Sequence, residues 1–328
     1  MKMKILVLGS NLGYNLDYYA FLNLQKLGHE VKFYGYRDKL PKKISNFVKL
    51  TATRSKLARE IEYTLFLKKI NKEIIYLTKS FEPDLVFVLK GEAIKKETIN
   101  AIKNQGIKTV LWYPDDPRFF NTYVKYLAPN YDYVFASSQK ALKNYKSIGV
   151  KKASYLTFAC EPTIHKKLKI NPKKEVTFIG SYMPSRIRLF KSLKKAPFNF
   201  EIYGPNWHLA SIKSNPAVYG PEMVKVVNNS KINLNIHATR GYGPNMRLFE
   251  VTGSGGFLIT DDTENIGKFF KADKDIVIYK DAKELIELIE YYLDNKRKAR
   301  EIADSGYKKC QKQHTYLNRM MEMLKKVK

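Results

Sequence analysis

The 328-residue sequence is short of cysteine, of acidic residues and of long apolar runs. Its two cysteines, Cys160 and Cys310, are far apart in the chain and form no metal-binding or redox motif. A disulfide-stapled secreted domain is therefore excluded, and an intracellular, cytoplasmic protein is expected. No run of about 18 apolar residues is present, so no transmembrane segment is predicted. The first nine residues are too short for a signal peptide and run directly into a predicted strand.

The shortage of acidic residues leaves a strongly basic chain. Lys and Arg number 59 against 31 Asp and Glu, which gives a formal net charge of +28. Such a charge attracts polyanions such as nucleic acid, anionic lipid or phosphorylated glycan. The alternative is a lysine-rich composition without a partner, since the lysines are spread along the whole chain. We expect an anionic partner, and peripheral contact with a membrane surface is left open.

The pattern that is present is an alternation of strands and helices, repeated twice. A hydrophobic fraction of 44% suffices for two cores, and the length suggests two domains of about 150 residues each. Near-continuous apolar strands separated by helices predict parallel sheets that are covered on both faces. The expected fold class is α/β, with two Rossmann-like doubly wound domains. Strands are expected at 4–9, 30–36, 83–91, 108–113, 131–137, 153–158, 175–180, 198–204, 231–236, 257–261 and 275–279. Helices are expected at 14–27, 54–81, 97–105, 185–194, 221–229, 245–253, 282–293, 296–312 and 315–328.

A polar stretch that contains Lys and Pro, residues 161–174, is typical of a linker. We place an N-terminal, acceptor-side domain at 1–165 and a second domain at 166–312. The last helix, within 313–328, is expected to pack back on the first domain. Two doubly wound domains that face each other would bring their strand carboxyl ends to a cleft, where ligands bind in such folds.

Residues 245–261 carry the most specific local pattern. They predict a helix that ends at glycines and leads into a buried strand. Arg247 and Glu250 are three residues apart and project from one helical face. Arginine suits phosphate oxygens and glutamate suits ribose hydroxyls, so the pair predicts a nucleotide site. The alternative is an intrahelical ion pair on a solvated face.

Two further segments contain candidate site residues. The loop 9–13 follows a strand and opens a helix, but it lacks the G-x-G-x-x-G pattern and is a weak dinucleotide signal. Asp115 and Asp116 end a predicted buried strand within a Pro-Asp-Asp-Pro segment, where they are either catalytic or turn-capping carboxylates. No Asp-x-Asp metal motif is present, since the Asp pairs at 115–116 and 261–262 are contiguous. No metal site is predicted, and a divalent metal requirement is left open.

Several of these segments together resemble a known family. They are 112–117 (Trp-Tyr-Pro-Asp-Asp-Pro), 178–181 (Phe-Ile-Gly-Ser), 200–204 (Phe-Glu-Ile-Tyr-Gly), 232–237 (Ile-Asn-Leu-Asn-Ile-His) and 245–257. Their order resembles that of GT-B glycosyltransferases, most closely the spore-protein CgeB-like group and more distantly the phage DNA β-glucosyltransferase. The resemblance covers nearly the whole chain. It implies transfer of a hexose or pentose from a nucleotide-sugar, such as a UDP- or GDP-sugar, to an acceptor hydroxyl, with no cofactor required.

The resemblance also implies roles for individual residues. Glu250 would accept hydrogen bonds from the ribose hydroxyls of the donor, and Arg247 would lie near its diphosphate. Gly180 and Ser181 would let a loop approach the phosphates, with charge from Arg186 or Arg188. The leaving nucleoside diphosphate gains negative charge, which such groups stabilise. Further donor contacts are expected from Tyr203, His237 and Asn245, and contacts of the cleft loop from Asn11 and Gly13.

One departure from the family pattern concerns the mechanism. Retaining GT-B enzymes carry E-x7-E, but the position eight residues before Glu250 is Tyr242. An inverting transfer is therefore expected, with Asp115 or Asp116 as the general base. Adjacent carboxylates raise each other's pKa, which suits a base, and likeness to the phage enzyme favours Asp115. The loop 241–244 is expected to close over the sugar.

The acceptor and the rival activities stay open at this point. An anionic acceptor is expected, namely modified DNA, a phosphate-bearing cell-surface polymer or another glycan. The alternatives are a retaining transferase on the same fold, a sugar-nucleotide epimerase and a non-catalytic polyanion-binding protein.

Overall fold

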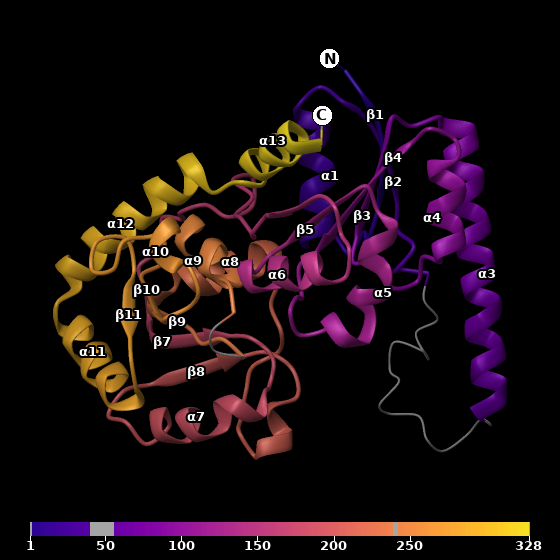
Figure 1. The fold of residues 1–328 in the computed structure, drawn as a ribbon. Helices are drawn as coiled ribbons and strands as arrows, with labels where there is room; N and C mark the ends of the chain where they lie inside the picture. Colours follow the sequence, from indigo (N-terminus) through magenta and orange to yellow (C-terminus); the bar gives the residue numbers. More distant parts are fainter. Residues whose placement is uncertain (1, 40–55, 239–241, 328) are drawn as a thin grey trace. The chain divides into compact units, whose positions relative to one another are not determined.

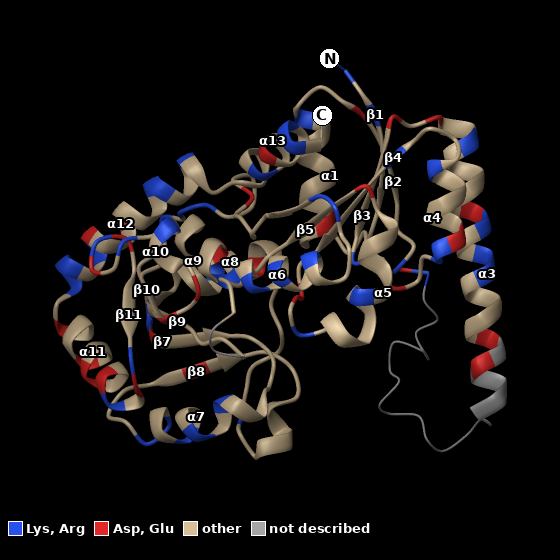
Figure 2. Cartoon of the chain, viewed as in Figure 1, with Lys and Arg blue, Asp and Glu red and all other residues tan. Residues whose placement is uncertain are grey.

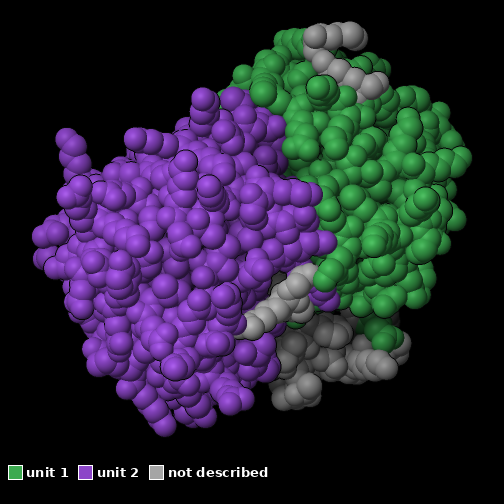
Figure 3. Space-filling view, turned by 60° about the vertical axis from the view of Figure 1, so that its left-hand side comes forward, with its two compact units in different colours: residues 1–156, 320–328 green, residues 157–319 purple. Residues whose placement is uncertain are grey.

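A computed structural model describes residues 2–39, 56–238 and 242–327. The chain divides into two compact units (Figure 3). The first unit comprises Met1–Leu156 with Met320–Lys328, and the second comprises Thr157–Arg319. The domain boundaries near residues 165 and 313 stay predictions.

The first unit is built on a six-stranded sheet with the order β2-β1-β3-β4-β5-β6, in which every pair of neighbours is parallel (Figure 1). The central strand β3 is buried along its whole length, as expected where helices cover both faces of a sheet. The strands are β1 (Lys4–Leu8), β2 (Glu30–Tyr34), β3 (Leu85–Leu89), β4 (Lys108–Tyr113), β5 (Tyr133–Ala136) and β6 (Ala153–Tyr155).

The helices of the first unit follow the expected alternation with two additions, the three-residue α5 and the longer α6. The sequence analysis missed α6, a lysine-rich helix that begins after its N-cap Ser138, whose hydroxyl accepts a hydrogen bond from the Lys140 backbone N–H. Its buried residues Ala141 and Tyr145 have helical i, i+4 spacing, which was the available signal. The helices are α1 (Leu16–Lys26), α3 (Lys56–Phe81), α4 (Lys96–Lys103), α5 (Lys125–Leu127) and α6 (Gln139–Ser147), with short π and 3-10 turns η1 (Phe120–Val124) and η2 (Ala128–Asn130).

The second unit is built on a five-stranded parallel sheet with the order β11-β10-β9-β7-β8. Its strands are β7 (Lys174–Ile179), β8 (Phe200–Tyr203), β9 (Ser230–Asn235), β10 (Leu258–Asp261) and β11 (Val277–Tyr279). Its helices are α7 (Ile187–Leu193), α8 (Gly220–Asn228), α9 (Met246–Gly253), α10 (Ile266–Phe269), α11 (Ala282–Asp294) and α12 (Lys296–Gln313), with 3-10 turns η3 (Pro184–Arg186) and η4 (Trp207–Ala210). The expected doubly wound α/β fold is therefore present in both halves of the chain.

The last helix, α13 (Tyr316–Val327), buries Tyr316, Met320 and Met323. Its end belongs to the first unit, where the Lys108 ammonium donates a hydrogen bond to the Val327 carbonyl at 2.9 Å. Within the described ranges, no helix has both the length and the hydrophobicity that crossing a bilayer requires. Lys and Arg are distributed over most helices of both units rather than on one element (Figure 2).

The two cysteines, which the sequence separates by 150 positions, are close together in the second unit. Both are free and buried, and both pack against Gly253 at the end of α9. A Cβ atom on Gly253 would lie 2.5 Å from the Cys160 Cβ and 3.4 Å from the Cys310 Sγ. The two thiols therefore share one packed site, although no sequence motif links the two cysteines.

Two loops at the carboxyl edge of the second sheet touch at glycines. Gly204, after β8, has φ +154°, and a Cβ atom there would lie 2.1 Å from the Gly180 carbonyl oxygen, after β7. The Gly180 carbonyl also accepts a hydrogen bond from the Trp207 indole at 2.9 Å. No side chain fits between these backbones, so Gly204 sets how closely the two loops approach.

Replacing Gly204 by alanine is therefore expected to lower the free energy of unfolding by about 1–3 kcal/mol, the usual cost of overpacking. Gly267→Ala in α10 is the matched control, because a Cβ atom there meets nothing within 4 Å. Urea unfolding, monitored by tryptophan fluorescence, measures the free energy of unfolding of both variants. Trp207 lies beside the altered loop and reports its unfolding. Equal midpoints for the two variants would contradict this account of the loop.

Candidate functional site

Arg186 connects two loops at the carboxyl edge of the second sheet. Its guanidinium donates to the Ile236 carbonyl at 2.6 and 3.0 Å and to the Ser181 carbonyl at 2.7 Å, and it lies 5.0 Å from the centre of the Phe178 ring. The residue is buried, and burial lowers its pKa to about 10. Arg186 thus uses its donors on backbone carbonyls and holds the loops, which differs from the phosphate contact implied by the resemblance.

His237 and Asn245 connect the end of β9 to the start of α9. His237 Nδ1 lies 2.7 Å from Asp261 Oδ1, and its Nε2 accepts a hydrogen bond from the Asn245 backbone N–H at 3.3 Å. Asn245 caps α9 by accepting from the Leu248 backbone N–H, and it donates to Asn235 Oδ1 at 2.9 Å. These contacts direct Nδ1 to Asp261 and Nε2 to the Asn245 backbone, and they fix the position of the first turn of α9.

Arg247 and Glu250, which the i, i+3 spacing places on one helical face, form the intrahelical ion pair that was the alternative to a nucleotide site. Arg247 Nη1 lies 2.7 Å from Glu250 Oε2, and the same nitrogen contacts the Met223 sulfur on α8. The side chains are 19% and 7% exposed, so the pair lies on a largely buried face. The alternative was an intrahelical ion pair on a solvated face. The ion pair is present, but the face that carries it is largely buried and not solvated.

The sequence analysis missed a third member of this cluster, His165. Its Nε2 lies 3.8 Å from Glu250 Oε1, and its Nδ1 accepts a hydrogen bond from the Glu161 backbone N–H at 2.8 Å. Burial lowers the pKa of His165, which keeps the imidazole neutral near pH 7. The residue lies in the stretch 161–174 that was expected to be a linker, yet Glu161 and His165 are fully buried in the second unit.

The remaining donor candidates lie at or near the same edge with different orientations. Ser181 and Arg188 are exposed, the first in the loop after β7 and the second on α7. The Tyr203 hydroxyl donates a hydrogen bond to Glu201 Oε2 at 3.0 Å, so this side chain is held by a residue of its own strand, β8. The Tyr242 carbonyl accepts from the Glu264 backbone N–H at 3.3 Å. Residue 241, the first of the loop 241–244 that is expected to close over the sugar, lies outside the described residues.

In the first unit, Asp115 and Asp116 follow β4 in different environments. Asp115 is 37% exposed and forms an ion pair with Lys90, which follows β3. Asp116 is buried and accepts a hydrogen bond from the Tyr145 hydroxyl. Burial raises the pKa of Asp116 from 3.8 to about 7, and the charge of Asp115 adds to the rise. The expected mutual effect of the two carboxylates is thus present at Asp116, but desolvation is the larger cause.

Because its pKa is raised, Asp116 makes stability depend on pH. The folded protein keeps a proton that the unfolded chain releases above about pH 4, so the free energy of unfolding falls as pH rises to about 7. The difference of about three between the two pKa values corresponds to about 4 kcal/mol above pH 7. Asp116→Asn removes this cost and keeps an acceptor for Tyr145. We expect its stabilisation over the natural protein, measured by urea unfolding, to be about 2–3 kcal/mol larger at pH 8 than at pH 5. A stabilisation that does not change with pH would contradict a raised pKa of Asp116 in the folded protein.

The loop 9–13 is held by two carboxylates. The Ser10 backbone N–H donates to Asp17 at 2.7 Å, while the Ser10 hydroxyl and the Asn11 backbone N–H donate to Asp38, both at 2.5 Å. Gly13 has φ +81°, a conformation that favours glycine. The Asn11 side chain is exposed at this edge of the first sheet. In the described part of the chain, no three His, Cys, Asp or Glu side chains are grouped so that they could hold a metal ion.

The architecture can be compared with known structures. A structure of sucrose-phosphate synthase from Thermosynechococcus elongatus superimposes with a TM-score of 0.70, at 10% identity, over 99% of this chain and 98% of that one. HepE (Alr3699) of Anabaena, in complex with UDP-glucose, superimposes with a TM-score of 0.67, at 12% identity, over 98% and 99%. The fold is GT-B. The predicted fold class is therefore confirmed.

The family comparison matches a part of this GT-B chain that includes α9. Residues 186–325, less than half of the chain, match the model of the family described as glycosyl transferase-like. The spore protein CgeB of Bacillus subtilis (strain 168) is 21% identical over 141 residues, which are 42% of this chain and 44% of that protein. The match thus spans less than half the length of this curated relative. Together these findings confirm the resemblance to GT-B glycosyltransferases and the CgeB-like group.

Proposed function

We propose that this protein is a glycosyltransferase that uses a nucleotide-sugar donor. The observation that carries the proposal is the Arg247–Glu250 pair on α9, largely buried in a helix whose first turn is fixed by Asn245. The match to the glycosyl transferase-like family includes this helix. The similar HepE structure contains UDP-glucose, which supports a nucleoside diphosphate as the leaving group.

In this proposal the donor breaks the ion pair when it binds. Arg247 turns from Glu250 to the diphosphate, and Glu250 then accepts hydrogen bonds from the ribose hydroxyls. The exposed Ser181 lies in a loop whose path is fixed by Arg186 and by Gly204. That loop supplies donors to the phosphate oxygens, so the developing negative charge is stabilised by groups that need little reorganisation. Arg186 is a positioning residue in this scheme, and Arg188 supplies long-range positive charge.

We further propose an inverting reaction in which Asp115 removes the proton of the acceptor hydroxyl. Its carboxylate is partly exposed and charged beside Lys90, so it can meet an acceptor. Asp116 is buried against Tyr145 and supports the turn that presents Asp115. The oxygen of the acceptor attacks the anomeric carbon, the bond to the diphosphate breaks, and the nucleoside diphosphate leaves.

The net charge of +28 supports an anionic acceptor, such as modified DNA or a phosphate-bearing glycan. The transferred group is a hexose or a pentose, and no cofactor besides the donor is proposed. The proposed location is the cytoplasm, with peripheral contact to a membrane surface if the acceptor lies there.

A product screen tests the proposed activity. The protein is incubated with UDP-, GDP- and ADP-sugars together with DNA, teichoic-acid-like polymers and neutral glycans, and the products are identified by mass spectrometry. We expect one donor to lose its sugar to one acceptor, with release of nucleoside diphosphate and inverted anomeric configuration by NMR. An isomerised donor with no nucleotide released would indicate an epimerase instead. Retained configuration would contradict the assigned base, and binding of polyanions without consumption of any donor would indicate a non-catalytic protein.

A further inference from the structure

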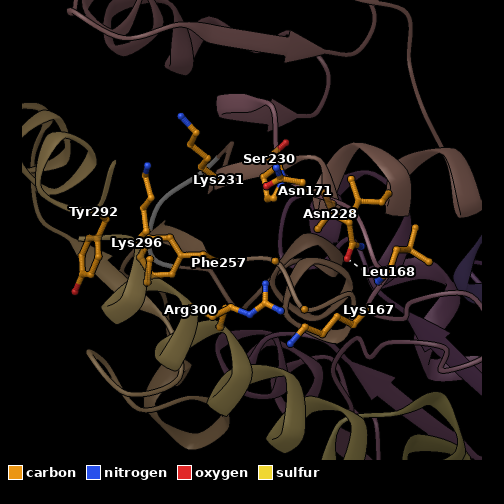
Figure 4. A pocket seen from close by; sticks show the side chains of 17 residues that line it. Lys167, Leu168, Asn171, Asn228, Ser230, Lys231, Phe257, Tyr292, Lys296 and Arg300 are labelled. Carbon is orange, nitrogen blue, oxygen red and sulfur yellow. Dashed lines mark hydrogen bonds between the residues drawn. The ribbon is translucent and has the colours of Figure 1, made fainter. Parts of the chain in front are cut away.

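A concave site lies at the amino edge of the second sheet, opposite the carboxyl edge near the proposed donor residues. It is a cavity of about 270 Å³, and β9 begins on its wall at Ser230, whereas the residues of the proposed donor site follow the other end of β9 (Figure 4). The other walls are the segment 167–172, the glycines after α9 and the first turns of α12. All of these residues belong to the second unit.

The charge of this cavity has one sign. No acidic residue lines the cavity. Four cationic side chains do, namely Lys167, Lys231, Lys296 and Arg300. Figure 4 shows Arg300 and Lys167 extending toward each other from α12 and from the segment 167–172. Asp304 does not line the cavity. Its Oδ1 lies 2.5 Å from Lys167 Nζ, and its Oδ2 lies 3.5 Å from Arg300 Nε. One carboxylate is therefore shared by two cations, and Glu175 Oε1 lies 3.7 Å from Lys231 Nζ. Two carboxylates thus face four cations, which leaves capacity for a bound anion.

The first turn of α12 adds positive charge where a helix disfavours it. It consists of Lys296, Arg297 and Lys298, contains no acidic residue, and follows Asn295, whose side chain does not cap the helix. Cations near a helix N-terminus each cost about 0.3–1 kcal/mol because they oppose the helix dipole. The arrangement does not serve the stability of the helix, and an anion bound beside Lys296 would offset its cost.

The rest of the lining is mixed: Asn171, Asn228 and Ser230 are polar, and the other side chains are mainly apolar. Phe257 and Tyr292 contribute aromatic rings, with 4.7 Å between their centres, and Leu168 contributes an aliphatic side chain. Gly255, at φ +76°, lies under the Lys167 stem, where a Cβ atom would come within 3.1 Å of it. The cavity thus combines cations for an anionic group with apolar surface for a small organic part.

We propose that this cavity binds a small organic phosphate, a phosphate ester or diphosphate with at least two negative charges. Arg300 provides paired donors for phosphate oxygens, and Lys167 and Lys296 provide point charges. The cavity volume suits a sugar phosphate, but not a polymer held along its length. This inference does not depend on the proposed transferase activity, because none of the residues involved belongs to the donor site.

Calorimetric titration of the full-length protein tests the inference, with inorganic pyrophosphate and glucose 1-phosphate as probes in 150 mM KCl. We expect the double variant Lys296→Gln/Arg300→Gln to bind both probes at least about tenfold more weakly, since it loses two charged contacts. The matched control is Arg297→Gln/Lys298→Gln, which removes the same charge from the same turn at residues outside the cavity. The control is expected to bind like the natural protein, within about twofold.

A further variant separates this site from the proposed donor site. Glu250→Gln is expected to keep the affinity for glucose 1-phosphate, while the cavity variant keeps the affinity for nucleoside diphosphates. Bound pyrophosphate should also protect Lys167 and Lys296 from acetylation, read by peptide mass spectrometry. Equal weakening by the cavity variant and its control would mean unspecific charge attraction and overturn the proposal. Loss of probe binding only in Glu250→Gln, or no binding by the natural protein, would overturn it as well.

Discussion

Asp115→Asn is expected to slow sugar transfer by about 10²- to 10⁴-fold, the usual contribution of a general base. The amide keeps the shape of the side chain but cannot take the proton of the acceptor hydroxyl. Donor affinity should not change, because the residues proposed to bind the nucleotide lie in the second unit. Initial transfer rates at saturating donor, together with nucleotide titrations, measure the two effects separately.

Asp132→Asn is a closely matched control for this variant. Asp132 is 35% exposed and pairs with Lys103 at 2.9 Å, much as Asp115 is 37% exposed and pairs with Lys90. The control loses a comparable surface ion pair, which is worth less than about 1 kcal/mol, and should keep its transfer rate. Full activity of Asp115→Asn with loss in Asp116→Asn would move the base to Asp116. Full activity of both would remove the base from this segment.

The second large effect is expected at Glu250. Glu250→Ala should lower the affinity for nucleoside diphosphate by about 10- to 100-fold, because hydrogen bonds from the ribose to a charged carboxylate are worth about 1.5–3 kcal/mol. Glu250→Gln, which keeps one carbonyl oxygen, should show a smaller loss. Calorimetric titration with the nucleotide that binds the natural protein gives both values.

An exposed ion pair of the same spacing provides the control for Glu250. Glu222 pairs with Lys225 on α8 at 2.7 Å with i, i+3 spacing, but both side chains are more than 60% exposed. Glu222→Ala should leave nucleotide affinity unchanged. Glu250→Ala also leaves Arg247 without its carboxylate on a buried face, so unfolding curves of both variants must accompany the titrations. Unchanged nucleotide affinity in a folded Glu250→Ala protein would refute the ribose contact.

The architecture could be predicted from the sequence because its signal is local. Apolar runs such as 85–89, bounded by turn residues, are typical of strands in a covered parallel sheet, and the structure has β3 there. That Arg247 and Glu250 lie on one helical face followed from their spacing in the same way, and the structure pairs them. By contrast, α6 was missed because Lys and Asn dominate its exposed face, so that two buried positions gave too weak a pattern.

The roles of single polar residues could not be predicted, because they depend on contacts that are distant in sequence. Arg186 was expected to face phosphate, but the carbonyl of Ile236, fifty positions away, accepts two of its hydrogen bonds. His165 was placed in a linker by composition, yet it lies beside Glu250. Composition reports average polarity, whereas burial of a polar residue is decided by the partner that the fold brings to it.

The central claim is that the second unit binds a nucleoside diphosphate at the start of α9. Titration of the natural protein with UDP, GDP and ADP tests it most directly, with calorimetry and the melting temperature as the two measurements. We predict that one of the three binds and raises the melting temperature, and that Glu250→Ala removes most of this effect while Glu222→Ala does not. Binding of none of the three, or an identical response of both variants, would contradict the account.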